Sequence, residues 1–164
     1  MSLLDLFKKN DANLISDIIQ DIKYNNKFKE YEGKTFIDIF NRSFEVNFTT
    51  SVDYAEKCIN SLSNKKLYDD ICNSLVKLCN EEVKYYLDEE EYASLYKLPR
   101  EQILSHVSDL SIIIDDFRED SIGYCIAGNC DWNEEHGFIV VICDNEIKHI
   151  GEHDNIYNPW DEYK

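Results

Sequence analysis

The pattern of hydrophobic and polar positions changes along the chain and predicts helices first and strands last. Between residues 12 and 23 aliphatic side chains recur at helical spacing, which predicts an amphipathic helix with Leu14, Ile15, Ile18, Ile19 and Ile22 on one stripe. Residues 24–34 are polar and contain Gly33, which is typical of a loop. Apolar positions then alternate through 35–48, which predicts two short strands with a turn at Asn41–Ser43.

In the middle of the chain, apolar residues recur at the spacing of helices. One helix is predicted from near Thr50, with Asp53 as its capping-box partner, to about Leu62. A longer helix is predicted over 67–87, and its apolar stripe consists of Tyr68, Cys72, Leu75, Val76, Cys79, Val83, Tyr86 and Leu87. Residues 88–100 contain an acidic run and Pro99, so a short helix or a loop is expected there.

Four short apolar runs follow and predict strands at Leu110–Ile114, Ile122–Ala127, Phe138–Cys143 and Ile147–Ile150. Asp144-Asn145 lies between the last two runs and suits a two-residue hairpin turn. The run F-I-V-V-I-C is apolar on both faces, so it should be a central strand with helices on one side and another cover on the other. The prediction is an α+β fold, with N-terminal helices packed on a C-terminal antiparallel β-meander of about four strands.

The length of 164 residues fits a single domain, 1–164. Its expected parts are an N-terminal helix and loop (1–34), short strands and helices (35–107) and the antiparallel sheet (108–164). The sequence contains no apolar stretch long enough to span a membrane, and Asp5 interrupts the only apolar run near its start. The six cysteines form no C-x-x-C pair and are expected to be reduced. These features predict a cytoplasmic protein that does not contact membranes.

The negative charge is concentrated in the second half of the chain. The formal net charge is −16; residues 1–80 hold 11 basic and 12 acidic residues, whereas residues 81–164 hold 6 and 21. Such a balance argues against binding to a phosphate backbone. It fits either a solvated face that maintains solubility or a docking face for a basic protein. For a docking face, the candidate contacts are Asp88, Glu89, Glu90, Glu91, Asp115, Asp116, Glu119 and Asp120, with Trp132 or a tyrosine as the apolar anchor.

The string from Cys130 to Gly137, followed by His149 and His153, contains the side chains best suited to chemistry. Its spacing matches no standard zinc pattern, so no metal or cofactor is predicted. The pair Cys130 and His136 could form a nucleophile and base, but acidic surroundings raise the pKa of a thiol and oppose this role. A structural interpretation is favoured, in which Trp132 packs over the sheet and Gly137 supplies an unusual backbone conformation.

Residues 128–138 read G-N-C-D-W-N-E-E-H-G-F, and an apolar strand, a turn and a second strand lead to I-G-E-H-D at 150–154. This pattern resembles an uncharacterised bacterial domain family with a W-x-x-E-H-G signature and a later G-x-x-D. The matching residues are Trp132, Glu135, His136, Gly137, Gly151 and Asp154. The resemblance extends over the chain from about residue 35. It implies an unknown function without established catalytic residues, although some members look like immunity proteins of toxin–immunity loci.

Two classes of function remain open. The first is a non-catalytic acidic binding protein, an immunity protein that neutralises a basic, nuclease-type toxin domain by occlusion. The alternative is a small metal-dependent hydrolytic enzyme centred on Glu135, His136 and His153, and a domain with a housekeeping role is a third possibility.

Overall fold

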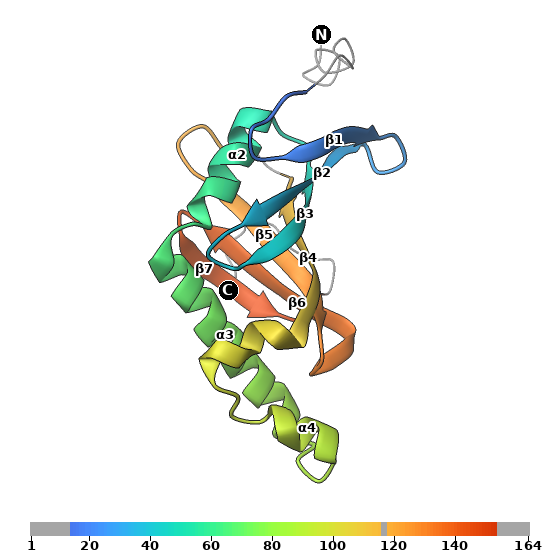
Figure 1. Ribbon diagram of the computed structural model, residues 1–164, viewed down its shortest axis with the longest axis vertical. Helices are drawn as coiled ribbons and strands as arrows, with labels where there is room; N and C mark the ends of the chain where they lie inside the picture. Colours follow the sequence, from blue (N-terminus) through green and yellow to red (C-terminus); the bar gives the residue numbers. More distant parts are fainter. Residues whose placement is uncertain (1–13, 116–117, 154–164) are drawn as a thin grey trace.

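A seven-stranded sheet forms the body of the molecule in the computed structural model, which describes residues 14–115 and 118–153 (Figure 1). The strands lie in the sheet in the order of the sequence. Neighbouring strands are antiparallel except β3 and β4, which are parallel. The strands are β1 (Gln20–Asn25), β2 (Glu30–Ile37), β3 (Arg42–Phe48), β4 (Val107–Ile114), β5 (Gly123–Cys130), β6 (Asn133–Cys143) and β7 (Glu146–Gly151).

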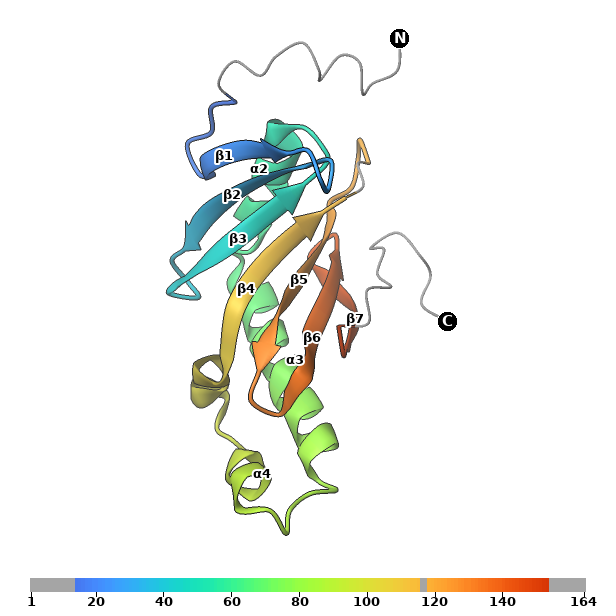
Figure 2. The same cartoon turned by 90° about the vertical axis from the view of Figure 1, so that its right-hand side faces the viewer.

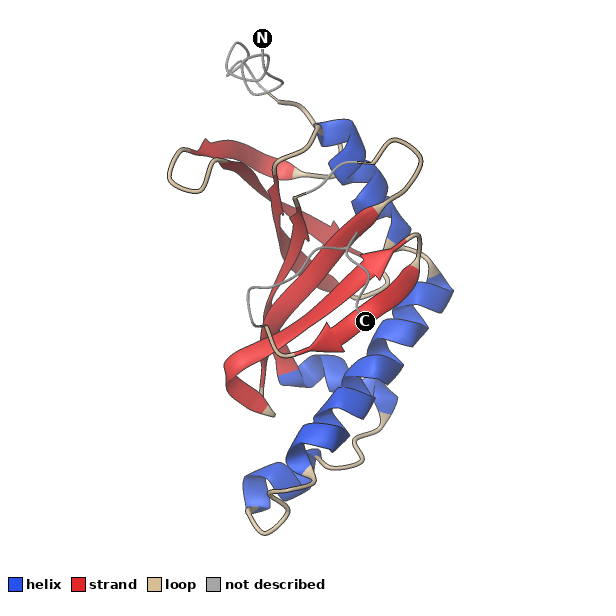
Figure 3. Ribbon diagram, turned by 180° about the vertical axis from the view of Figure 1, so that it is seen from behind, coloured by secondary structure: helices blue, strands red, loops and turns tan. Residues whose placement is uncertain are grey.

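The helices form the connection between β3 and β4, because parallel neighbours require a crossover. They are α2 (Val52–Ser61), α3 (Lys65–Val83), α4 (Glu90–Leu95) and the 3₁₀ helix η1 (Arg100–His106). Figures 1 and 2 show α2 and α3 against one face of the sheet, while Figure 3, from behind, shows the strands in front of the helices. The end of α3 runs past the edge of the sheet, and α4 folds back beside it. None of the helices within the described ranges has the length and apolar character that a membrane crossing needs.

The main core lies between the sheet and the helices. Alternate residues of the strands point to this side, among them Phe44, Val46 and Phe48 of β3 and Phe138, Val140 and Ile142 of β6. The buried stripe of α3 that meets them consists of Leu67, Ile71, Cys72, Leu75, Leu78, Cys79 and Val83. A second, smaller cluster of Cys125, Ala127, Ile139 and Val141 lies on the opposite face. β6 is therefore buried on both faces, as its unbroken apolar run predicts.

The prediction of N-terminal helices on a C-terminal meander of about four strands is wrong. The meander β4–β7 is present, but it continues through β3 into two further strands, so the sheet has seven strands and most of the fold is sheet. Within the described residues the helices are not N-terminal, because they all follow the third strand. Because they carry the chain from β3 to β4, the first three strands and the last four become one sheet.

The helix predicted over residues 12–23 is absent from its described part, which instead leads into the edge strand β1. The Ser16 hydroxyl accepts hydrogen bonds from the amides of Ile18 and Ile19, and this local turn replaces helical bonding. Ile19 is 2 % exposed whereas Ile15 is 82 % exposed, so the isoleucines do not share one face. The loop predicted over 24–34 is also wrong, because β2 begins at Glu30 and its Gly33 makes room for Ile19.

Several other helices, strands and turns have boundaries that differ from the predicted ones by a few residues. The turn between β2 and β3 lies at 38–41 instead of Asn41–Ser43, since the Asn41 amide donates to the Asp38 carbonyl and Asn41 adopts a φ of +50°. Ser51, rather than Thr50, caps α2 by accepting from the Tyr54 amide. The long helix ends at Val83, before the expected residue 87. The Asp144-Asn145 turn has φ values of +50° and +65°, as its residue types predict.

Candidate functional site

The hairpin between β5 and β6 contains most of the W-x-x-E-H-G signature and lies beside the last turns of α3. Trp132 is only 4 % exposed, and its ring stacks on Phe138 with centroids 6.3 Å apart. Burial of such a ring supplies a large apolar contact. The structure therefore places Trp132 in the core, where it is not presented to a partner.

Asn133 links the hairpin to two other elements. Its Nδ2 donates to Glu82 Oε2 of α3 at 3.2 Å and to Glu152 Oε1 after β7 at 3.0 Å. Its Oδ1 accepts from the His136 amide at 3.1 Å, which closes the turn. Burial, and next the negative charge of Glu152, raise the pKa of the Glu82 carboxyl, while the Asn133 hydrogen bond opposes the rise. No sequence signal marked Asn133 or Glu82 for this role, because their contact joins positions 51 residues apart.

The remaining residues of the signature differ in exposure. The Glu135 and His136 side chains are 86 % and 51 % exposed, with 3.9 Å between Oε1 and Nε2. Gly137 adopts a φ of +64°, and a Cβ there would meet the Gly128 carbonyl. Gly151 ends β7, and Asp154 lies outside the described residues. Trp132, Asn133 and Gly137 thus shape the hairpin, while Glu135 and His136 lie at its surface.

The described residues do not assemble the chemistry considered for this hairpin. Within 14–115 and 118–153, no three His, Cys, Asp or Glu side chains are grouped to hold a metal ion. Burial raises the pKa of the Cys130 thiol to about 12, and its Sγ points to the Asn133 carbonyl, 3.7 Å away. A thiol with such a pKa is a poor nucleophile at neutral pH. Nearby, His106 Nδ1 lies 2.8 Å from Asp131 Oδ2 and ties the end of η1 to the hairpin, a contact that the sequence did not predict.

The two acidic clusters lie at opposite ends of the molecule. Asp88, Glu89, Glu90 and Glu91 lie in the connection from α3 to α4 and at the start of α4. Asp115, Glu119 and Asp120 lie between β4 and β5, beside α2 and far from α4 (Figures 1 and 2). Asp116 is outside the described residues. A single acidic docking face that includes both clusters is therefore not what the fold provides.

The first cluster belongs to a projecting surface, residues 85–91, which we call the acidic tip. Three large apolar side chains are exposed on it: Tyr85 (74 %), Tyr86 (51 %) and Leu87 (41 %). Lys84 Nζ lies 4.8 Å from the Tyr85 ring centroid, and the Tyr86 ring packs against Tyr92 at 5.4 Å. Across the part of the chain that the structure describes, no Lys, Arg or His forms an ion pair with the tip carboxylates.

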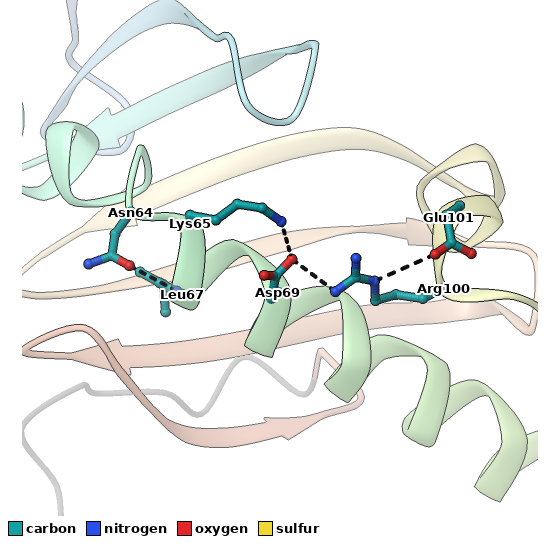
Figure 4. Close-up of polar contacts among 6 residues, drawn as sticks. All are labelled: Asn64, Lys65, Leu67, Asp69, Arg100 and Glu101. Carbon is teal, nitrogen blue, oxygen red and sulfur yellow. Dashed lines mark hydrogen bonds and ion pairs between the residues drawn. The ribbon is translucent and has the colours of Figure 1, made fainter.

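The tip is held at its base by contacts between α3 and the segment that returns from it. The Lys97 amide donates to Asn80 Oδ1 at 2.6 Å, and Cys79 Sγ lies 3.5 Å from the Leu95 carbonyl. Nearer the start of α3, the Asp69 carboxylate forms ion pairs with Arg100 at 2.9 Å and with Lys65 at 2.5 Å (Figure 4). The contacts of Lys97 and Leu95 therefore hold the returning segment against α3 at the base of the tip.

Comparison with known proteins places this arrangement in a family. Searches of curated proteins and of solved structures each gave no match. A family model described as a domain of unknown function (DUF6985) matches residues 18–157, which include the seven strands and the helices described above and the whole signature. The chain therefore belongs to the DUF6985 family.

Proposed function

We propose that this chain is a non-catalytic binding protein whose acidic tip docks onto a basic surface of a partner protein. The observation that carries the proposal is one projecting segment with three exposed apolar side chains and four carboxylates, for which the described residues provide no ion-pair partner. Tyrosines are enriched among the residues that dominate binding energy at protein interfaces. Carboxylates around them accelerate association with a positively charged partner.

The shape of the tip supports insertion into a concave site. Tyr85, Tyr86 and Leu87 come after Lys84, the C-cap of α3, and this end of α3 lies beyond the edge of the sheet (Figure 1). A projecting segment reaches the floor of a cleft without the rest of the molecule entering it. The tip carboxylates would take the positions of phosphates in a cleft that binds nucleic acid, which is the chemistry of a nuclease-type toxin domain.

We further propose that the protein acts in the cytoplasm as an immunity protein that occludes such a toxin domain. The resemblance to families with immunity members and the excess of acidic residues support this role. All six cysteines are free, as expected in a reducing compartment. No residue of the chain is assigned a catalytic step.

The experiment is to co-express the chain with the product of the gene upstream of its own and to measure association of the purified pair at several salt concentrations. For the wild type we expect a complex whose association rate falls as salt rises. The tip variant Asp88→Lys/Glu89→Lys should associate at least about tenfold more slowly and with a weaker salt dependence. Both positions precede α4, so the first turn of that helix keeps its own carboxylates.

The second acidic cluster provides the matched control. Glu119→Lys/Asp120→Lys changes the net charge by the same amount at the opposite end of the molecule. If the control slows association as much as the tip variant, long-range attraction rather than contact at the tip explains the rate. A Tyr85→Ser/Tyr86→Ser variant tests the contact itself, because lost hot-spot residues accelerate dissociation, and unchanged dissociation would refute the proposed interface.

A further inference from the structure

A hollow of about 460 Å³ lies on the face of β1–β3 that points away from the helices. Phe44, Val46 and Phe48 of β3 enter the main core on the helix side. The residues between them, Glu45 and Asn47, therefore point to the opposite face, where they line the hollow. Its volume lies in the range of small-molecule sites, about 300–1,000 Å³. Figure 1 shows β1 and β2 at the end of the molecule opposite α4, so the hollow is separate from the acidic tip.

The lining of the hollow is charged and contains two more carboxylates than ammonium groups. The charged residues are Asp21, Glu30, Glu32 and Glu45, with Lys23 and Lys34. Lys23 Nζ lies 3.6 Å from Glu32 Oε2 and compensates that carboxylate. Lys34 is opposite Glu45 in the strand register, yet Glu30, Lys34 and Glu45 form no ion pair with any residue that the structure describes. The hollow therefore has negative charge left to bind a cation.

The surroundings of Glu30 favour a bound cation. Burial, and next the negative charges of Asp115 and Glu32, raise the pKa of the Glu30 carboxyl. A positive charge beside this group would offset the repulsion between the carboxylates. The Phe28 ring borders the hollow and is 61 % exposed. Lys27 Nζ lies 5.0 Å from the centroid of that ring, which is the contact that an amine makes with an aromatic side chain.

We propose that this hollow binds a small aliphatic polyamine, whose ammonium groups contact the carboxylates of Glu30 and Glu45. Glu45 pairs with Lys34, which lies four residues along β2 from Glu30. The backbone positions of the two glutamates are therefore about 14 Å apart. One ammonium group cannot contact carboxylates at both ends, whereas a polyamine carries several such groups along a flexible stem. The charged lining also gives a largely apolar ligand little surface to contact.

The edge of the sheet argues for a small ligand rather than a basic peptide. β1 is the edge strand beside the hollow, and a peptide that adds to a sheet requires a regular row of backbone groups. The register between β1 and β2 shifts between Gln20 and Lys23, and Asp21 has a φ of +56°. Such a bulge interrupts pairing along the edge.

The experiment is a titration of the full-length chain with spermidine in about 0.15 M salt, followed by calorimetry and by NMR of the backbone amides. We expect saturable binding, with the amide shifts centred on β1–β3. Glu30→Gln/Glu45→Gln keeps the size of both side chains and should weaken binding at least about tenfold. The matched control, Asp88→Asn/Glu89→Gln, removes the same charge from the acidic tip and should change the affinity less than about twofold.

Equal weakening in the two variants would overturn the proposal, because spermidine would then be only a counterion of an acidic protein. Absence of saturable binding would overturn it as well, and so would binding of a tetra-arginine peptide without binding of spermidine. A second measurement uses the wild-type chain and follows the Glu30 carboxyl by NMR as pH is changed. Saturating spermidine should lower the pKa of Glu30, since a nearby positive charge favours the ionised carboxylate. An unchanged pKa would equally refute the site.

Discussion

Gly137→Ala should strongly destabilise the fold, although it adds only one methyl group. Gly137 has a φ of +64°, in the left-handed region that a residue with a Cβ adopts at a cost. A Cβ at this position would lie less than 3.0 Å from the Gly128 carbonyl oxygen and 3.2 Å from its carbon. Both contacts are to the backbone of the paired strand β5, which cannot rotate away as a side chain can.

The expected magnitude follows from these two costs. A left-handed conformation costs a non-glycine residue about 1–2 kcal/mol. The contact with β5 forces a shift in the strand pairing, and together the two effects should cost about 2–4 kcal/mol. A domain of this size has a total stability of about 5–15 kcal/mol, so the loss would be a large share of it.

Urea unfolding followed by circular dichroism measures the change in the free energy of unfolding. A shift of the urea midpoint with an unchanged m-value reports that change. Gly151→Ala is the matched control. Gly151 has no positive φ, and among the described residues the contacts of an added Cβ are to the ring of His149, 3.2 Å away. We expect the control to cost less than about 1 kcal/mol. Equal effects at the two glycines, or a Gly137→Ala change within about 0.5 kcal/mol of wild type, would refute the backbone argument.

Two further predictions concern the same hairpin. Trp132→Ala should cost about 3–5 kcal/mol in urea unfolding, whereas His136→Ala, at the surface, should stay within about 0.5 kcal/mol of wild type; the reverse order would favour a structural role for the histidine. Glu82→Gln tests the raised carboxyl pKa: the stability from this group is present below pH 4.5 and is lost as pH rises through the raised value. The glutamine variant should therefore match or exceed wild-type stability at pH 7, and its advantage should vanish on acidification. A variant less stable at pH 7 than at pH 4, relative to wild type, would contradict this sign.

The elements that could be predicted from the sequence are those whose signals are local. The alternation in β3 and the apolar runs of β4–β7 reflect side chains that point to fixed faces of one sheet. The heptad spacing of Cys72 and Cys79 reflects one buried face of α3. The turn at Asp144-Asn145 depends only on residues that tolerate a positive φ.

The N-terminal error has a physical cause in tertiary contacts. Isoleucines at helical spacing suit a helix, but isoleucine is also β-branched and favours strands. What decides the outcome is the gap at Gly33, where Ile19 Cγ2 would lie only 2.5 Å from an added Cβ. That gap forms only when β1 and β2 pair, so it leaves no trace in the local pattern.

The residue types of the candidate site could be predicted from the sequence, but their positions in space could not. The residues Asp88–Glu91 and Asp115, Glu119 and Asp120 all belong to the acidic second half of the sequence. Strand β4 runs between the two clusters and places them at opposite ends of the molecule. Trp132 suited an interface anchor by residue type, and its burial against Phe138 depends on how the hairpin folds over α3. Tyr86 and Leu87 were predicted on the apolar stripe of the long helix, but the helix ends at Val83 and both side chains are exposed.

The structural role of the hairpin and the proposed binding role of the acidic tip are connected through α3. Asn133 binds Glu82 in the last turn of that helix, three residues before Tyr85. Trp132 packs in the same core as Cys79 and Val83, the last buried residues of α3. A hairpin that fixes the final turn also fixes where the tip leaves the helix and therefore how its tyrosines face a partner. On the proposed function, the hairpin that carries the W-x-x-E-H-G signature would contribute to binding by positioning the acidic tip.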